Sequence, residues 1–175
     1  MKNFLIISLF FLIVGCPKLI DEPSLIEKNG VMYLPLSDKP YSGDVSKLDN
    51  FGKKLLKGTY KNGKKDGLWT WWYENGQKRR ERTFKDGELG GLSTFWYEDG
   101  QKMGEGTYKN GNRVGLYTQW FENGQKEYEE TYKGGKEDRL WTWWYENGQK
   151  LKEETYKDGE LISEKYWNED GSVKE

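Results

Sequence analysis

A self-similarity with a period of 24 residues is the feature that most constrains how this chain folds. Aromatic-rich blocks begin at Leu68, Leu92, Leu116 and Leu140, and each block ends in the letters ENGQK or EDGQK. A second block, typified by the letters GTYKNGK from Gly58, recurs between them with the same spacing. A fixed period of about 20–50 residues is the signature of repeat architectures, in which each unit contacts mainly its neighbours.

Each period predicts a β-hairpin. The segment Leu68–Glu74 is rich in Trp, Thr and Tyr, which favour strands. Asn75-Gly76 follows it and predicts a tight two-residue turn, because both residue types tolerate a positive φ. Lys78–Phe84 is then the return strand, and Lys85–Gly91 makes a looser connection to the next hairpin. The chain has 22 Gly and no Ala, which argues against a helical domain.

The predicted fold class is all-β, an elongated antiparallel β-meander of 24-residue hairpins in a single sheet. We expect about ten to twelve strands, with Val31–Pro35 adding one at the start. The first copy, around Gly43 and Asn50-Phe51-Gly52, is degenerate, and the last, Tyr166–Ser172, arrives one residue early. Atypical terminal copies are expected of capping units. The repeat domain is predicted to span residues 31–175 with about six repeats.

Strand alternation assigns the side chains to two faces. Leu68, Thr70 and Trp72 point one way and recur unchanged in the later repeats, so we predict a ladder that holds the sheet together. The opposite face varies, since Trp69 becomes Ser93, Tyr117 and Trp141. We predict that this varying face is the binding face; its candidates are Trp69, Trp71, Tyr73, Phe95, Tyr97, Tyr117, Trp141, Trp143 and Tyr145. Either it is an exposed apolar patch, which marks an interaction site, or the protein's own Lys and Arg side chains cover it.

Two local departures from the repeat carry further expectations. Arg139 stands where the other repeats have Gly67, Gly91 and Gly115, so we expect a different bend there. A basic cluster, Lys78-Arg79-Arg80 with Arg82, is matched two repeats later by the acidic stretch 127–130. The cluster either contacts an anionic lipid or an acidic partner, or is a solvated edge that prevents aggregation.

The N-terminus reads as a leader. Lys2 precedes an apolar run of 11 residues, Phe4–Val14, the length of a signal-peptide core and short of the ~20 residues of a spanning helix. Ile13-Val14-Gly15-Cys16 resembles the lipobox of bacterial lipoproteins. That resemblance implies a signal peptide at 1–15 and lipid modification of Cys16, which anchors the protein in the bacterial cell envelope, facing the periplasm or exterior. Residues 16–30 are then the lipidated cysteine and a tether. The alternative is a buried strand with an incidental cysteine.

Composition excludes several functional classes. Lys and Arg number 28 against 29 Asp and Glu, and a net charge of −1 argues against a nucleic-acid partner. Histidine is absent and cysteine occurs once, which excludes histidine-based catalytic pairs, histidine metal ligands and an internal disulfide. Glu74, Glu98, Glu122 and Glu146 recur once per repeat, so none is distinguished as a catalytic acid. We predict that the protein is not an enzyme and uses no cofactor or metal.

The repeat itself resembles a known family. Residues 60–76 read YKNGKKDGLWTWWYENG, which is similar to the MORN repeat and to its bacterial variant in YwqK-type antitoxins. The resemblance covers Tyr41–Ser172. It implies a scaffold or interaction surface, and some MORN arrays bind membranes. We therefore expect a lipid-anchored, protein-binding scaffold module, antitoxin- or immunity-like. An exported chain departs from an antitoxin whose toxin is cytoplasmic. The alternative is a cell-wall or carbohydrate binder with aromatic hairpin cages.

Overall fold

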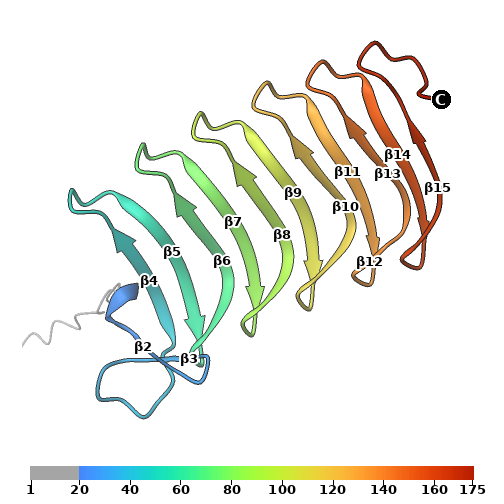
Figure 1. The fold of residues 1–175 in the computed structure, drawn as a ribbon. Coiled ribbons are helices and arrows are strands. Elements are labelled where there is room, and N and C mark those ends of the chain that lie inside the picture. Colours follow the sequence, from blue (N-terminus) through green and yellow to red (C-terminus); the bar gives the residue numbers. More distant parts are fainter. Residues whose placement is uncertain (1–19) are drawn as a thin grey trace, which may run out of the picture.

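The computed structural model describes residues 20–175. The predicted signal peptide, lipobox and Cys16 lie outside the described residues. A row of antiparallel hairpins builds one long single-layer sheet, in which each strand pairs with the next in sequence (Figure 1). Among residues 20–175, the one parallel pairing in this sheet joins β1 (Ile20–Asp21) to β4 (Gly43–Leu48). The predicted all-β meander is confirmed.

The remaining strands of the sheet follow the 24-residue period. They are β5 (Lys54–Lys61), β6 (Lys64–Trp72), β7 (Lys78–Lys85), β8 (Glu88–Trp96), β9 (Lys102–Lys109), β10 (Asn112–Trp120), β11 (Lys126–Lys133), β12 (Lys136–Glu137), β13 (Arg139–Trp144), β14 (Lys150–Lys157) and β15 (Glu160–Tyr166). Even-numbered strands from β6 to β10 begin four residues earlier than the aromatic blocks, because the turn before them is tighter than the sequence suggested.

The two edges of the sheet carry different turns, and the predicted turn types are exchanged. At one edge, Asn62-Gly63 has positive φ at both residues, 51° and 74°, which is the two-residue hairpin turn predicted for Asn75-Gly76. At the other edge only Gly76 has a positive φ. There the Gly76 amide donates to the Tyr73 carbonyl and the Asn75 Oδ1 accepts from the Gln77 amide, which makes a longer loop. The asparagine side chain, and not its φ, is therefore what this second turn requires.

Arg139 keeps the positive φ that glycine has at this position in the other repeats. Its φ is 63°, close to the 77° of Gly67 and the 72° of Gly115, while Gly91 has 128°, so the expectation of a different bend was wrong for the backbone of residue 139 itself. The strand is instead interrupted just before it, where Asp138 separates β12 from β13. A side chain in this left-handed region is strained, because its Cβ crowds the following carbonyl oxygen.

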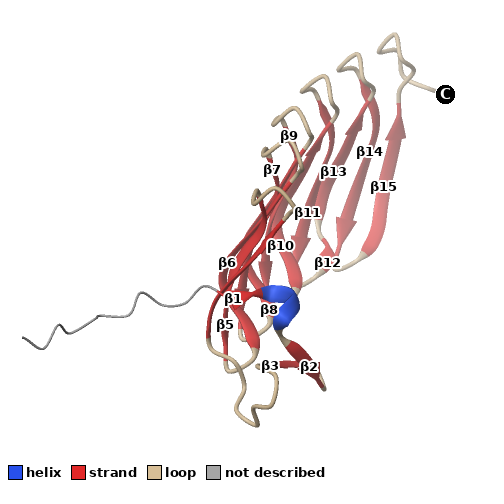
Figure 2. Ribbon diagram, turned by 90° about the vertical axis from the view of Figure 1, so that its left-hand side faces the viewer, coloured by secondary structure: helices blue, strands red, loops and turns tan. Residues whose placement is uncertain are grey.

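The segment before the first hairpin packs on the sheet. Residues 20–30, predicted as part of a tether, form β1, a single 3-10 turn η1 (Glu22–Ser24) and β2 (Ile26–Lys28), which pairs with β3 (Val31–Tyr33). Figure 2 shows these elements beside the first strands of the long sheet. Leu25 and Tyr41 join Val45, Tyr60 and Trp69 in one buried cluster. The tether prediction was therefore wrong for residues 20–30, and the segment caps the exposed start of the array.

Candidate binding face

The predicted binding residues lie together on one face, here called the variable face, and the identical Leu, Thr and Trp residues lie on the other, the constant face. Cross-strand register arranges the variable face in two rows. The Arg80 row contains, in order across the sheet, Leu56, Trp71, Arg80, Phe95, Gly104, Gln119, Tyr128, Trp143, Lys152 and Tyr166. The Arg82 row contains Trp69, Arg82, Ser93, Gly106, Tyr117 and Glu130, and continues with Trp141 opposite Glu154.

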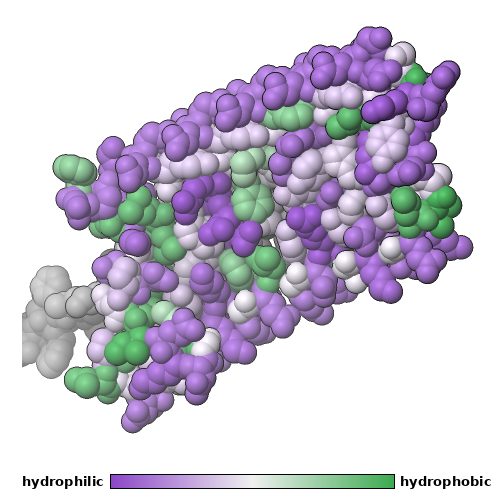
Figure 3. All heavy atoms as spheres, viewed as in Figure 1, coloured by the Kyte–Doolittle hydropathy of each residue, from purple (hydrophilic) through white to green (hydrophobic). Residues whose placement is uncertain are grey.

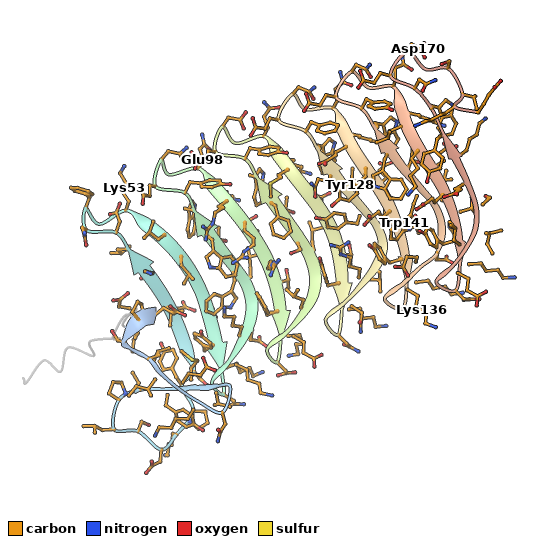
Figure 4. The ribbon with its side chains drawn as sticks, viewed as in Figure 1. Lys53, Glu98, Tyr128, Lys136, Trp141 and Asp170 are labelled. Carbon is orange, nitrogen blue, oxygen red and sulfur yellow. The ribbon has the colours of Figure 1, made fainter. Side chains whose placement is uncertain are left out.

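The rings of the variable face are covered, so the hypothesis of an exposed apolar patch was wrong. Trp69 is 0% exposed and Trp71, Tyr117 and Trp141 are 7–8% exposed. Phe95, Tyr97, Trp143, Tyr73 and Tyr145 are half-buried. The alternative, coverage by the protein's own cationic side chains, is what the structure shows. Figure 4 shows Trp141 and Tyr128 over the middle of the sheet with their neighbours around them.

Lysine and arginine side chains cover several of these rings, while Tyr132 and Tyr156 pack against Trp141. The Lys65 Nζ lies 4.4 Å from the Trp69 ring centroid, and the Arg80 guanidinium lies 4.1 Å from that of Trp71. Arg113 lies 4.2 Å from Tyr117, and Lys152 lies 4.6 Å from Trp143. Such contacts join cation–π attraction to burial of the apolar stem. They let a single-layer sheet bury aromatic rings without a second layer.

Glycines on the neighbouring strand make room for two of the rings. A Cβ on Gly58 would stand 2.1 Å from the Trp69 ring, and one on Gly106 would stand 2.4 Å from Tyr117. In the same position of the other repeats stand Arg82, Glu130 and Glu154. Glycine on the preceding strand therefore accompanies the rings of Trp69 and Tyr117, and Arg82 accompanies the small Ser93, whereas Trp141 stands opposite Glu154.

The tyrosines at the turn edge join one repeat to the next. The hydroxyl groups of Tyr73 and Tyr97 each donate to a tryptophan carbonyl 23 residues later, at 2.7 Å, and that of Tyr145 donates to the Trp167 carbonyl at 3.0 Å. Asn75 Nδ2 makes a parallel bond to the Glu98 carbonyl at 2.7 Å. These three predicted binding residues thus hold the array together through bonds between repeats.

The constant face carries the expected ladder with one exception. Thr70 is buried and donates to Glu81, which also pairs with Lys78 at 2.8 Å, and Lys78 reaches over the ring of Trp96 in the next repeat. The same contacts recur one repeat later through Thr94, Glu105, Lys102 and Trp120. The leucines are the exception, because Leu68, Leu92, Leu116 and Leu140 are 48–56% exposed.

Cations in the C-terminal half of the variable face have carboxylates beside them. Arg113 pairs with Glu130 at 3.1 Å and also donates to the Tyr132 hydroxyl, which itself donates to Glu130. Burial raises the pKa of Glu130, and the Tyr132 hydrogen bond and the Arg113 charge oppose that rise. Glu154 pairs with Lys152 and accepts from Tyr156, whose pKa rises to about 12 chiefly through burial and then through this hydrogen bond.

The N-terminal half of the same face has the opposite balance. Within residues 20–175, no carboxylate oxygen lies within 4 Å of the charged nitrogens of Lys65, Arg80 or Arg82. The Nε atoms of both arginines and the Ser93 Oγ are buried with no hydrogen-bond partner in the described part of the chain. Burial lowers the pKa of Lys65; Arg80 and Arg82 lower it further, while Glu22 opposes them. The sequence indicated a basic cluster here but placed Lys78 and Arg79 in it and missed Lys65.

Hydrophilic side chains cover most of the variable face, with paler aromatic residues between them (Figure 3). Among residues 20–175, no group of three or more His, Cys, Asp or Glu side chains is placed to hold a metal ion. In the same range, no helix has the length and apolar character to cross a membrane. The site therefore offers charged and polar contacts on a broad sheet face.

Comparison with known protein families shows to which family the repeats are related. The family described as the MORN repeat variant matches residues 65–86, 89–110, 113–133 and 140–158. The repeat array belongs to the MORN repeat variant family. Each matched segment of the MORN array is a pair of strands joined by a turn at one edge, and the gap after 133 contains Arg139. No curated protein matches the chain. The predicted resemblance is confirmed, while the YwqK-type assignment and the lipoprotein leader stay predictions.

The structure extends the MORN array beyond the matched residues at both ends. The Gly52 amide donates to the Asp49 carbonyl, as that of Gly76 does to Tyr73, so the degenerate first copy makes the same turn. Gly171 and Asn168 repeat it at the C-terminal end. Both terminal copies thus keep the turn, and the last copy also keeps the aromatic pair Tyr166-Trp167.

Proposed function

We propose that this MORN array is a non-enzymatic scaffold whose variable face binds another protein, in an antitoxin- or immunity-like role. One observation carries the proposal: the two faces of the same strands differ in how they repeat. The constant face presents the same leucine, threonine and tryptophan in each central repeat, while the two rows of the variable face change at almost every strand. A face needed only to hold the sheet together has no requirement to vary, whereas a specific interface does.

The placement of the acidic residues supports a binding role over catalysis. Glu74, Glu98, Glu122 and Glu146 all lie exposed at one edge of the sheet, one per repeat. The turns that carry them stand two strands apart, and Glu74 and Glu98 line one open pocket at this edge. The variable face instead offers stacked guanidinium groups and rings, which are enriched at protein interfaces.

The proposed location is the cell envelope, with the array tethered by a lipid on Cys16 and facing the periplasm or exterior. The lipobox-like sequence supports this location. The N-terminal segment enters the fold beside β4, at the first end of the array. An anchor at that end leaves the rest of the variable face accessible.

A capture experiment with blocked faces tests the proposal. The chain has one cysteine, Cys16, so the domain from residue 17 onward, tagged in place of the lipid, has none. A single cysteine at Gln119 or at Leu116, both on β10, places a bulky maleimide label on the variable or the constant face respectively. The bait is incubated with detergent-extracted cell envelope, and bound proteins are identified by mass spectrometry.

We expect one stoichiometric protein partner, lost when Gln119→Cys carries the label and kept when Leu116→Cys carries it. Loss of the partner only when Leu116→Cys carries the label would assign binding to the constant face and contradict the proposal. Retention on purified wall material without a protein partner would instead establish the cell-wall binder. Binding of neither a protein partner nor wall material would contradict the proposal and indicate that the array is a structural spacer.

A further inference from the structure

The cationic cluster formed by Lys65, Arg80 and Arg82 differs from every other cation group on the variable face. Arg82 and Ser93 lie opposite each other on β7 and β8, and Arg80 lies opposite Phe95. Arg80 stacks on Trp71, and Arg82 lies 5.0 Å from the Phe95 ring centroid. Lys65 lies within 5.4 Å of the Trp71 ring that Arg80 also contacts. The cluster therefore concentrates three positive charges over a floor of aromatic rings.

The equivalent positions two and three repeats later show what this cluster lacks. Glu130 and Glu154 occupy the place of Arg82, and each pairs with a cation that covers a ring. In the N-terminal half, Glu22 is the one carboxylate that acts on Lys65, and it already accepts a hydrogen bond from Tyr60 at 3.3 Å. A buried donor without an acceptor destabilises the fold. Arg80 Nε, Arg82 Nε and Ser93 Oγ are buried with no hydrogen-bond partner among residues 20–175, so this cluster lacks the acceptors that the glutamates of the later repeats supply.

We infer that Lys65, Arg80 and Arg82 form a binding site for carboxylates on an extended acidic segment of the protein partner. This inference rests on the proposed function and names the chemistry of that partner. Arginine favours carboxylate because its planar N–H donors match the two oxygens. Stacking on a ring occupies the face of the guanidinium and leaves its donor edge for a ligand.

The spacing of Arg80 and Arg82 indicates which pattern of acidic residues in the partner's segment fits the site. Residues 80 and 82 are two positions apart on one strand, and a strand advances about 3.4 Å per residue, so their Cα atoms stand about 7 Å apart. Alternate side chains of an extended peptide have the same separation and point the same way. A segment with acidic residues at alternate positions therefore places one carboxylate on each arginine. Two adjacent acidic residues instead send their carboxylates to opposite sides of the strand, so that only one of them reaches the arginines.

Peptide titration tests the site with the domain from residue 17 onward. The probes are two eight-residue peptides of six Thr and two Glu, one with the two Glu at alternate positions and one with them adjacent, together with inorganic phosphate. Binding is measured by calorimetry at low salt and again at higher salt. The variants are Arg82→Gln, Arg80→Gln and, as the matched control from the same strand, Arg79→Gln. Each variant is first checked for an unchanged circular dichroism spectrum.

We expect the peptide with Glu at alternate positions to bind more tightly than the peptide with adjacent Glu. Arg82→Gln and Arg80→Gln should each weaken binding by tenfold or more, which corresponds to about 1.4 kcal/mol. Arg79→Gln should change it less than threefold. Arg82→Glu, which copies the Glu130 of a later repeat, should abolish binding. Because each lost ion pair removes one charge contact, the salt dependence of binding should also fall in the arginine variants.

Several results would overturn the inference. Equal weakening by Arg79→Gln and Arg82→Gln would indicate diffuse charge attraction. Equal affinity of the two peptides would remove the argument from spacing, and phosphate binding as tight as the peptide would indicate a small-anion site. The capture experiment separates this inference from the proposed function: a partner blocked by the Gln119 label, yet captured undiminished by an Arg80→Gln/Arg82→Gln bait, keeps the function and rejects this site.

Discussion

Substituting Gly58 by alanine tests how the variable face closes over its rings. The added Cβ would stand 2.1 Å and 2.3 Å from the Cδ2 and Cε2 atoms of Trp69, where ordinary contact begins at 3.4 Å. Trp69 is fully buried, with Tyr60 on one side, Phe84 on another and the Lys65 ammonium above it. The ring has no free space to enter, so the strain must appear as lost stability.

The cost follows from packing energetics. Inserting a methyl group into a well-packed core typically costs about 1–3 kcal/mol, and the double clash with a rigid indole places Gly58→Ala near the upper end. Without the clash, replacing a strand glycine by alanine gains roughly 0.5–1 kcal/mol. Gly90→Ala is the matched control, because its Cβ would meet only Lys85 Cβ at 3.6 Å. We therefore expect Gly58→Ala to destabilise by about 2–3 kcal/mol and Gly90→Ala to be neutral or stabilising.

Urea unfolding of the domain, followed by circular dichroism, measures both substitutions. A double-mutant cycle adds Trp69→Ser, because serine is the residue at the same position of the next repeat, Ser93. In that background Gly58→Ala should cost almost nothing, which gives a coupling free energy of about 2–3 kcal/mol. A cost for Gly58→Ala that is the same with and without the Trp69 ring would refute the pairing of glycine with ring.

Three further predictions concern single residues. Arg139→Gly should raise the free energy of unfolding by about 1 kcal/mol in urea unfolding, because it removes a side chain from a backbone with φ of 63°; a loss of stability would show that the Arg139 side chain matters more than its backbone. Tyr97→Phe should cost about 1 kcal/mol by losing its bond to the Trp120 carbonyl, whereas Phe121→Tyr, at the matching position, should gain a similar amount; equal effects of the two changes would contradict the bond between repeats. Because the pKa of Glu130 is raised above 4.5, its contribution to stability is complete below that pH and is lost as pH rises through the raised value. The free energy of unfolding of Glu130→Gln should therefore rise relative to that of the wild type as pH increases from 4 to 7. A difference between the two that does not change with pH would rule out a raised pKa of Glu130.

The repeat determined how much of the fold the sequence revealed. The period, the strand alternation and the capping copies follow from which residues recur, and the structure has all three. The turn types did not follow, because Asn-Gly serves two different loops: Asn62 adopts a positive φ, while Asn75 bonds its neighbour's amide. Local sequence does not separate these loops, since the choice depends on how the flanking strands pair.

The sequence also does not reveal how the aromatic rings of the variable face are covered. Its residues were placed on the correct face, but a tryptophan count does not show which cation lies over each ring. Lys65 reaches Trp69 from the start of the same strand, and Arg80 reaches Trp71 from the neighbouring one. Likewise, Leu25 packs against the first hairpins from a segment that is not part of the repeat, so the repeat pattern does not predict this contact.

Hydroxyl-radical footprinting of the free domain tests most directly the central claim that the aromatic rings of the variable face are covered and structural. Modification of each side chain is read by mass spectrometry and divided by its intrinsic reactivity. The account predicts protection of Trp69, Trp71 and Trp141, which are at most 8% exposed, and modification of Leu68, Leu92, Leu116 and Leu140, which are about half exposed. Tryptophans on the variable face that react as freely as those leucines would contradict it.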